Sequence, residues 1–241
     1  MKIVRFMLDD DLLCGVLHGE DRIAYRPDPE LTVEKLLAGD AGAAAAFKAI
    51  ADGGNDIREV ALARVELLAP VASTPNNVFC VGLNYRDHVA ESAQITTVAD
   101  DIAAPTFFTK TAGTIAPPTG EIPLWTHVTQ ALDYEVELAV VIGKAGRDIR
   151  AADAMDHVFG YSIANDVSAR DAQFRHGGQW FKGKSLDGSL PLGPWLVTRD
   201  EVADLAGLVL SLSVNGEERQ RATVGEMIFD IPTLISNCRQ A

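Results

Sequence analysis

Residues 133–143, with the sequence DYEVELAVVIG, constrain this chain more than any other segment. Five of the six residues before Gly143 are aliphatic and three of these are β-branched, which predicts a buried strand. Side chains alternate along a strand, so Glu135 and Glu137 point to the same face. Two neighbouring carboxylates on an apolar strand must be protonated, fully solvated or neutralised by a cation. An oxygen-binding metal ion is the simplest such cation.

A third acid follows at the end of the next predicted strand, which covers residues 158–166. Ser168 follows two residues after Asp166 and is expected to cap a helix. Glu135, Glu137 and Asp166 would supply three hard oxygen ligands without Cys or His, which disfavours zinc and copper and favours Mg²⁺, Mn²⁺ or Ca²⁺. An isolated E-x-E pair is more often a solvated edge strand. Because this strand looks buried and the next one also ends in an acid, we predict a metal site.

Four further motifs accompany this strand. They are VGLNYRDH at 81–88, PTFFTK at 105–110, NDVSARD at 165–171 and KGKSLDG at 182–188. Together with DYEVEL, in their order and spacing, they resemble the fumarylacetoacetate hydrolase (FAH) superfamily, in its acylpyruvate hydrolase and hydroxymuconate isomerase-like branch. The resemblance implies a divalent metal, Mg²⁺ or Mn²⁺, on the E-x-E pair and the later Asp. It also implies 2-oxo acid or β-dicarbonyl substrates and a homodimer.

The fold class that we expect is mixed α/β and mostly β. Short strands and turns alternate without βαβ regularity, and the Asn-Gly pair at 215–216 predicts a hairpin. Residues 1–70 are expected to form a small N-terminal α+β domain, with a helical stretch over 31–52 that breaks near Gly39. Residues 71–241 are expected to form the catalytic domain, for which the resemblance implies an FAH-type rolled β-sandwich.

His88 and Glu91 are three residues apart, so they share a face on a short helix. A carboxylate beside an imidazole orients it and raises its basicity, as the activation of water requires. The alternative is a chance pair on a surface helix. The resemblance favours the first interpretation, because it implies such a dyad on a lid over the metal. His88 and Glu91 are therefore candidate catalytic residues, together with Lys184.

Basic side chains gather after the third acid. Five of them fall within fifteen residues: Arg170, Arg175, His176, Lys182 and Lys184. The resemblance makes Arg170, Gln173 and Lys110 candidate substrate-binding residues, which would hold the carboxylate or enolate oxygens of a 2-oxo acid. The alternatives are a basic turn for Lys184 and an ordinary strand-end lysine for Lys110.

Composition limits the partners and the location. The formal net charge is −13 and the pI about 4.7, which argues against nucleic acid and anionic membranes as partners. No apolar run reaches transmembrane length, and the N-terminus lacks a signal-peptide core. The three cysteines are far apart and in no ligand spacing. We therefore expect a cytoplasmic protein that acts on a small-molecule 2-oxo acid.

The C-terminus departs from the family pattern. The chain matches the MIFDIP motif at 227–232 and ends at Ala241, so we expect a C-terminally incomplete catalytic domain without its closing strands. Gly188 also occupies a position where many relatives carry Thr or Ser. We predict a divalent-metal-dependent hydrolase that cleaves the C–C bond of acylpyruvate-type substrates. The alternatives are an oxaloacetate decarboxylase, a 2-hydroxymuconate-type isomerase, and a truncated, non-catalytic metal-binding family member.

Overall fold

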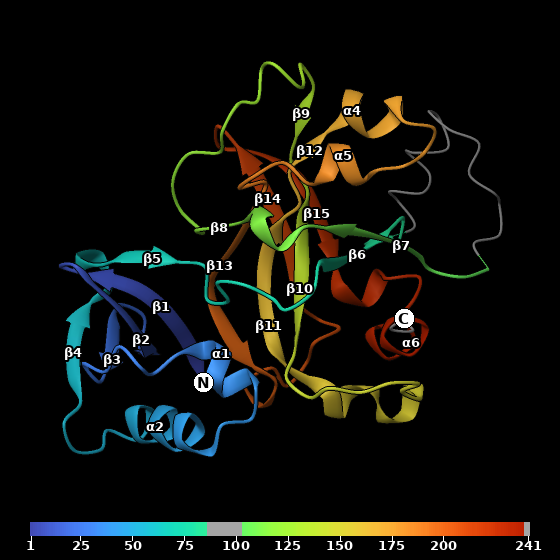
Figure 1. The fold of residues 1–241 in the computed structure, drawn as a ribbon. Coiled ribbons are helices and arrows are strands. Elements are labelled where there is room, and N and C mark those ends of the chain that lie inside the picture. Colours follow the sequence, from blue (N-terminus) through green and yellow to red (C-terminus); the bar gives the residue numbers. More distant parts are fainter. Residues whose placement is uncertain (86–102, 239–241) are drawn as a thin grey trace.

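A nine-stranded sheet runs from the N-terminal part of the chain into its C-terminal half (Figure 1). The structure, a computed structural model, describes residues 1–85 and 103–238. The strands of this sheet are β1 (Lys2–Leu8), β2 (Asp11–His18), β3 (Arg22–Tyr25), β4 (Arg58–Ala61), β5 (Glu66–Leu68), β8 (Ile115–Ala116), β10 (Val136–Ile142), β11 (Val158–Asn165) and β13 (Leu190–Thr198). Their main order is β10-β11-β13-β1-β2-β3-β4, while β5 pairs with β1 and β8 with β13. Strand β10 is therefore one end of the path.

Two helices accompany the N-terminal strands, α1 (Val33–Leu37) and α2 (Ala41–Ala51). They are separated at Gly39, whose φ of +80° is a left-handed conformation that suits glycine, so the predicted break is confirmed. Phe47 of α2 is fully buried and belongs to the same apolar cluster as Leu196 of β13. The N-terminal helices therefore share their core with the C-terminal half.

The main sheet crosses from one half of the sequence to the other through a single strand pair. Lys2 in β1 lies opposite Val197 in β13, in antiparallel register. In Figure 1 the N-terminal elements, drawn in blue, lie to one side of β10, β11 and β13. The division into residues 1–70 and 71–241 stays a prediction about folding units.

Three two-stranded sheets complete the strands of the C-terminal half. They pair β6 (Val78–Gly82) with β7 (Thr106–Lys110), β9 (Leu132–Asp133) with β12 (Ser168–Ala169), and β14 (Val209–Val214) with β15 (Glu217–Thr223). The last pair turns at Asn215 and Gly216, both with positive φ (53° and 81°), as the Asn-Gly pair predicts.

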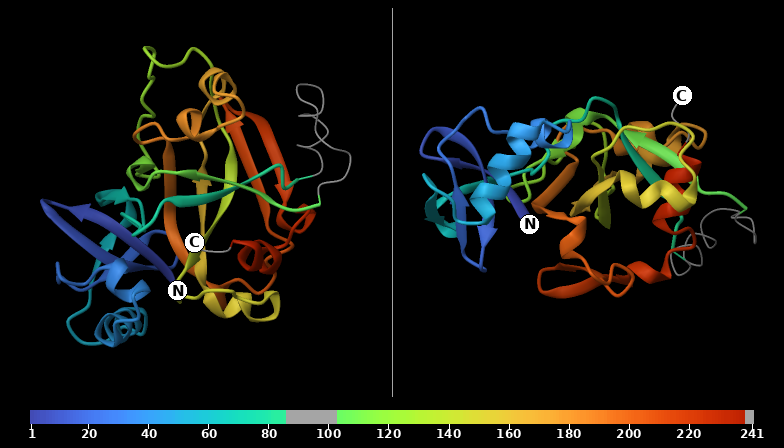
Figure 2. Two further views of the ribbon diagram at one scale, coloured as in Figure 1. Left: turned by 45° about the vertical axis from the view of Figure 1, so that its right-hand side comes forward. Right: turned by 90° about the horizontal axis from the view of Figure 1, so that it is seen from below.

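The remaining elements of the described residues are short helices. They are η1 (Leu62–Arg64), η2 (Ala112–Thr114), η3 (Ala151–His157), α4 (Arg170–Arg175), α5 (Phe181–Lys184), η4 (Arg199–Glu201), η5 (Val224–Glu226) and α6 (Ile231–Asn237). Helices α4 and α5 lie near one end of β10, and α6 packs against η3 near the other end (Figures 1 and 2). No helix among the described residues is long and apolar enough to cross a membrane. The predicted mixed, mostly β fold class is confirmed.

Strand β10 is half-buried and not fully buried as predicted, and it is apolar on both faces because each face packs in part against an apolar cluster. Leu138 and Val140 pack against the cluster around Tyr161, whereas Ala139 and Val141 pack against the larger core shared with the N-terminal part. This explains the near-continuous run of aliphatic residues in the sequence. The acidic residues come at the start of β10, where this apolar packing ends.

Candidate metal centre

Three carboxylates meet at one end of the β10–β11 pair. Oxygen atoms of Glu135, Glu137 and Asp166 all lie within 4.8 Å of one another. The antiparallel register explains this, because Val136 lies opposite Asn165, so Glu135 and Asp166 flank the same end of the ladder. The structure thus brings the three predicted ligands together, while their binding of a metal ion stays a prediction.

Hydrogen bonds of the main chain hold this arrangement. The Asp166 amide donates to the carbonyl of Glu135 at 2.8 Å, and the Glu135 amide donates to Oδ1 of Asn165 at 3.0 Å. Ser168 does not cap a helix as expected. It lies in β12, its hydroxyl donates to the Asp166 carbonyl at 2.8 Å, and α4 begins only at Arg170. These hydrogen bonds therefore position Glu135 and Asp166 without a helix cap at Ser168.

Two buried lysines neutralise part of the acid cluster. Nζ of Lys184 lies 2.6 Å from Oε2 of Glu135 and 2.8 Å from Oδ2 of Asp166, and its side chain is 2% exposed. Nζ of Lys110 lies 2.7 Å from Oδ1 of Asp166, and its side chain is fully buried. Burial lowers the pKa of Lys110 despite its partner, Asp166. Burial alone would also lower the pKa of Lys184, but its two carboxylate partners raise it overall.

Arg170 is engaged with protein carboxylates. Its Nη1 lies 2.6 Å from Oε1 of Glu135, and its Nε donates to Oδ2 of Asp133 at 2.8 Å. The same Nη1 donates to Oε1 of Gln173 at 3.1 Å. Burial opposes the charge of Arg170, but the coulombic attraction of Glu135 and the bond to Asp133 leave its pKa raised. The guanidinium therefore orients one predicted metal ligand, whatever further role it has toward a substrate.

The predicted basic cluster separates into two groups. Lys184 and Arg170 reach the carboxylates, whereas Arg175, His176 and Lys182 are exposed. These three side chains are solvated, as the alternative of a solvated basic loop expects, although Arg175 lies in α4 and Lys182 in α5 and not in a loop. For Lys184, by contrast, burial against two acids excludes a solvated turn.

Glu137 is the least compensated member of the triad. Burial, together with the charges of Asp166 and Glu135, raises its pKa to about 8. Among the described residues, no hydrogen-bond or ion-pair partner of its carboxylate is found. A group of three oxygen ligands with one uncompensated carboxylate fits a hard divalent cation such as Mg²⁺ or Mn²⁺.

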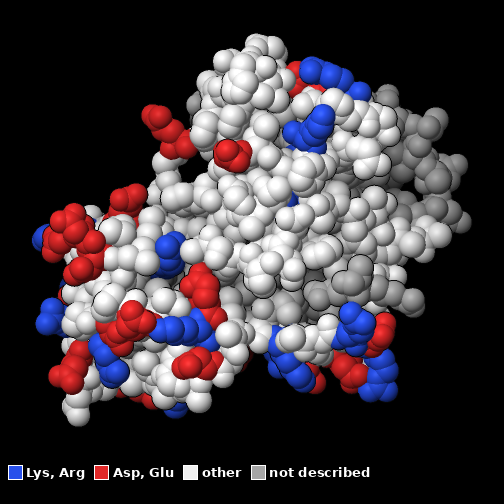
Figure 3. All heavy atoms as spheres, viewed as in Figure 1, with Lys and Arg blue, Asp and Glu red and all other residues white. Residues whose placement is uncertain are grey.

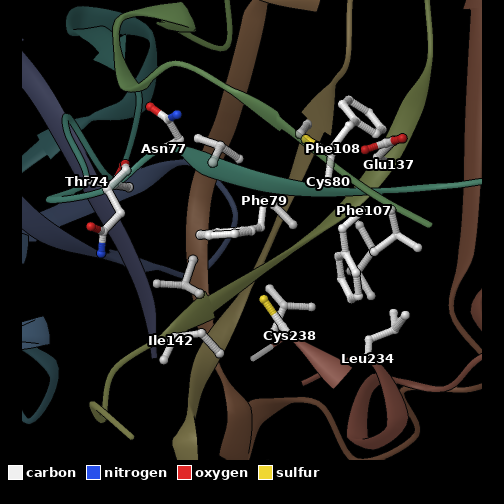
Figure 4. Close-up of a pocket in the computed structure, with 18 of the residues that line it drawn as sticks. Thr74, Asn77, Phe79, Cys80, Phe107, Phe108, Glu137, Ile142, Leu234 and Cys238 are labelled. Atoms are coloured by element: carbon white, nitrogen blue, oxygen red, sulfur yellow. The ribbon is translucent and has the colours of Figure 1, made fainter. Parts of the chain in front are cut away.

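A cavity of about 1190 Å³ opens beside the triad. Figure 4 shows Glu137 next to Cys80 and Phe108 at one side of this cavity, with apolar side chains such as Phe79 and Leu234 around the rest. Burial raises the pKa of the Cys80 thiol, which is therefore a thiol and not a thiolate.

In Figure 3 charged side chains gather over the N-terminal elements and at the lower right, while the middle of that face carries few.

The sequence predicted some of the residues at this site and missed others. His88 and Glu91 lie outside the described residues. Asp133, which holds Arg170, was not predicted, although its position two residues before Glu135 on the same strand face was a usable signal. Gln220, which contacts the main chain beside Glu135, left no signal in the sequence.

The family assignment rests on a match that covers most of the chain. Residues 77–241 match the family model described as fumarylacetoacetate (FAA) hydrolase C-terminal, which is more than half of the sequence. The chain belongs to the fumarylacetoacetate hydrolase family. As a family member it is 46% identical over 174 residues to oxaloacetate tautomerase YisK of Bacillus subtilis (strain 168). That match covers 72% of the chain and 56% of YisK.

Solved structures of the family support the same assignment. The fumarylacetoacetate hydrolase EaFAH from the psychrophile Exiguobacterium antarcticum is 34% identical, with a TM-score of 0.79, and the match covers 100% of the chain and 81% of EaFAH. Maleylpyruvate hydrolase from Sphingobium sp. SYK-6, in complex with manganese(II) ion and pyruvate, is 29% identical with a TM-score of 0.75. This match covers 99% of the chain and 83% of the hydrolase. The chain spans 56% to 66% of the length of the curated oxaloacetate tautomerases that it matches.

These similarities favour the predicted oxaloacetate alternative over the predicted acylpyruvate hydrolase. The family is enzymatic, and the curated relatives named above are oxaloacetate tautomerases, whereas hydrolysis is represented by more distant solved structures. The cytoplasmic location and the homodimer stay predictions.

Proposed function

We propose that this chain is a divalent-metal-dependent enzyme that interconverts the enol and keto forms of a small 2-oxo acid, with oxaloacetate as the first candidate. The observation that carries the proposal is the triad of Glu135, Glu137 and Asp166, in a chain 46% identical over 174 residues to an oxaloacetate tautomerase. Tautomerisation moves a proton between C3 and the 2-oxo oxygen and breaks no carbon–carbon bond. It therefore requires a group that carries the proton and a site that tolerates negative charge on oxygen.

The charges of the site suit an anionic substrate. Asp133 and the triad supply four carboxylates, against the three cations Arg170, Lys110 and Lys184. A divalent ion held by the triad would turn this local excess of negative charge into a positive one. The site could then attract a dicarboxylate although the whole chain carries −13. When bound, the ion would supply electrophilic stabilisation of the charge that develops on the 2-oxo group.

Two further roles belong to the proposal. Lys184 already lies among the carboxylates and, once an ion shares them, its ammonium would donate to a substrate carboxylate or enolate oxygen. His88, oriented by Glu91, would carry the proton to and from C3. Gln173 and Arg170 would contact the far carboxylate of the substrate. A homodimer is part of the proposal, and its mass in solution can be measured by light scattering.

Hydrolysis of acylpyruvates is the second candidate function. It is favoured by the similarity to maleylpyruvate hydrolase in complex with manganese(II) ion and pyruvate. In that reaction the dyad of His88 and Glu91 would activate water, which attacks the second carbonyl while the carbon–carbon bond breaks. The two candidates share the metal site and differ in the role of the dyad.

A substrate panel separates these functions. Enol-oxaloacetate and acylpyruvates are supplied with Mg²⁺, Mn²⁺ or EDTA, and loss of enol absorbance and release of pyruvate are measured separately. Tautomerisation predicts metal-dependent loss of oxaloacetate enol faster than pyruvate appears. Pyruvate release from acylpyruvates would favour the hydrolase, and pyruvate release from oxaloacetate would favour a decarboxylase. Metal binding without turnover of any substrate would overturn the enzymatic proposal and favour a non-catalytic family member.

Variants of two neighbouring lysines test the role of Lys184. Lys184→Met keeps the length and apolar stem of the side chain but breaks a buried ion pair, so kcat/KM is compared on folded protein well below the melting temperature of the variant. Loss of a charge-assisted hydrogen bond should lower kcat/KM by about 30- to 150-fold. Lys182, two residues earlier and exposed, provides the matched control. Lys182→Met should change kcat/KM by about twofold at most. Equal effects of the two substitutions would remove Lys184 from the catalytic set.

The dyad requires a different readout. His88→Ala should lower kcat by about 10²- to 10⁴-fold, the usual contribution of a general acid–base group. Mn²⁺ affinity, measured by calorimetry, should be unchanged because His88 is not among the proposed ligands. Unchanged turnover in this variant would show that another group carries the proton.

A further inference from the structure

The β14–β15 hairpin contacts the metal-site strand through one side chain. The Val136 amide donates to Oε1 of Gln220 at 2.9 Å, and Nε2 of Gln220 donates to the carbonyl of Tyr134 at 3.4 Å. These two main-chain groups lie immediately before and after Glu135. The carboxamide of Gln220 therefore forms hydrogen bonds to the main chain on both sides of Glu135, which we propose as a metal ligand.

On the side of β10 that faces the hairpin, no strand among the described residues pairs with the main chain at Glu135. Strand β9 ends at Asp133 and β10 begins at Val136, so Glu135 lies in the interval between them. On the other side, Asn165 and Asp166 already bond to Glu135. The side chain of Gln offers one acceptor and two donors, as a peptide group would offer an acceptor and a donor. Gln220 thus takes the place of a neighbouring strand.

An irregularity in the hairpin lies at this residue. Leu212 pairs with Gln220, but the next residue, Ser213, pairs with Glu218, so one residue of β15 is skipped. Such bulges change the direction of nearby side chains and are frequent beside active sites. Gln220 is half-buried, whereas most of the surrounding strand is exposed. Its orientation toward β10 is therefore a local feature of this hairpin.

We infer that Gln220 is a positioning residue of the metal centre, which fixes the main chain that carries Glu135. The inference rests on the proposed metal-binding role of Glu135. Gln220 touches neither the triad carboxylates nor the cavity. Its effect passes through the main chain at Tyr134 and Val136. A merely structural role, in which Gln220 ties the hairpin to the sheet, would affect stability but not metal affinity.

The test compares two neighbouring residues of β15. Gln220→Met keeps the length of the side chain and removes its hydrogen bonds, and Mn²⁺ affinity by calorimetry should fall by about 10- to 100-fold, as for other residues that orient metal ligands. Arg221→Met is the matched control, because Arg221 is exposed and, within the described part of the chain, its ion pair is with Glu218 of the same hairpin. Its Mn²⁺ affinity should stay within about twofold of the unmodified chain.

A second variant and a second measurement guard against misfolding. Gln220→Asn keeps the carboxamide but shortens its reach, so Mn²⁺ affinity should also fall. Amide hydrogen exchange of the metal-free protein should show faster exchange at Val136 in both Gln220 variants. Mn²⁺ affinity within twofold of the unmodified chain in a folded Gln220→Met protein would overturn the inference alone. Absence of Mn²⁺ binding by the unmodified chain would overturn the metal role of Glu135, and this inference with it.

Discussion

The amide of Asp166 donates a hydrogen bond to the carbonyl of Glu135 at 2.8 Å. Glu135 and Asp166 are thus joined through their main chains and not only through the Lys184 ammonium between their side chains. The strand pair β10–β11 sets their separation. Single substitutions that keep the side-chain shape should therefore change charge at the site with little movement of the remaining ligands.

Glu137→Gln is expected to separate metal binding from folding. The amide keeps the shape of the side chain but removes the charge that burial and two neighbouring acids oppose. Without metal, at pH 8.5, the melting temperature should be equal to or above that of the unmodified chain. Added Mn²⁺ at about 100 times its Kd should stabilise the unmodified chain by about 2.7 kcal/mol and leave the variant unaffected.

Thermal melts with EDTA or Mn²⁺ measure both effects. Glu20→Gln, an exposed carboxylate in the β2–β3 turn, is the control and should keep the full response to Mn²⁺. A Glu137→Gln protein that Mn²⁺ still stabilises by the full amount would exclude Glu137 as a ligand.

The stability of the metal-free protein should fall as pH rises. The pKa of Glu137 is about 8 in the folded chain, against 4.5 for an ordinary glutamate, so the folded state binds more protons between these values. Unfolding free energy decreases with pH wherever the folded state binds more protons. The contribution of Glu137 is therefore fully present below pH 4.5 and is lost as pH rises through 8. Urea denaturation in EDTA at pH 6 and 8.5 measures the difference.

The Glu137→Gln variant provides the comparison for this pH dependence. Its stability should change less between pH 6 and 8.5, because the titrating group is absent. An identical loss of stability in both proteins would mean that a group other than Glu137 titrates in this range.

Lys110→Met should destabilise the fold strongly. Lys110 is fully buried and holds Asp166 at 2.7 Å and the carbonyl of Val167 at 3.2 Å. Removing one partner of a buried ion pair costs about 3–5 kcal/mol, or about 6–20 °C in melting temperature for a chain of this size. Lys48→Met, which breaks an exposed pair with Asp52 on α2, should cost about 0.5 kcal/mol at most. Similar melting temperatures for both variants would contradict the buried role of Lys110.

The sequence predicted those parts of the site that depend on local geometry. Glu135 and Glu137 share a face because strand side chains alternate, and Asp166 follows because the next strand pairs back antiparallel. The overall fold class and the break at Gly39 depend on similarly local signals.

Contacts between distant segments could not be read in the same way. Lys110, the last residue of β7, reaches Asp166 just after β11, and Gln220 reaches Val136 from beside a bulge in β15. Ser168 shows the opposite failure, because a residue with a strong capping preference bonds to the Asp166 carbonyl and leaves α4 without a side-chain cap. Pairing of Ser168 in β12 with Asp133 in β9 places it in a strand and not at the start of a helix.

Gly183→Ala should displace Lys184 by pushing two short helices apart. A Cβ at Gly183 would lie 2.4 Å from the amide nitrogen of Gln173, 2.6 Å from its Cα and 2.7 Å from the carbonyl oxygen of Ala169. These are main-chain atoms, which cannot rotate away as a side-chain end can. Helix α5 must therefore shift relative to α4, at a cost of about 1–3 kcal/mol for overpacking.

The same shift should affect the site, because Lys184 is the next residue and its ammonium lies within 2.8 Å of two carboxylates. We expect Gly183→Ala to lower both the melting temperature and kcat/KM. Gly113→Ala is the matched control, since a Cβ there meets no atom within 4 Å and its φ is not positive, so its stability should stay within about 0.5 kcal/mol. A Gly183→Ala protein with unchanged stability and unchanged turnover would show that α4 and α5 are packed less tightly than the structure indicates, and that the position of Lys184 does not depend on their contact.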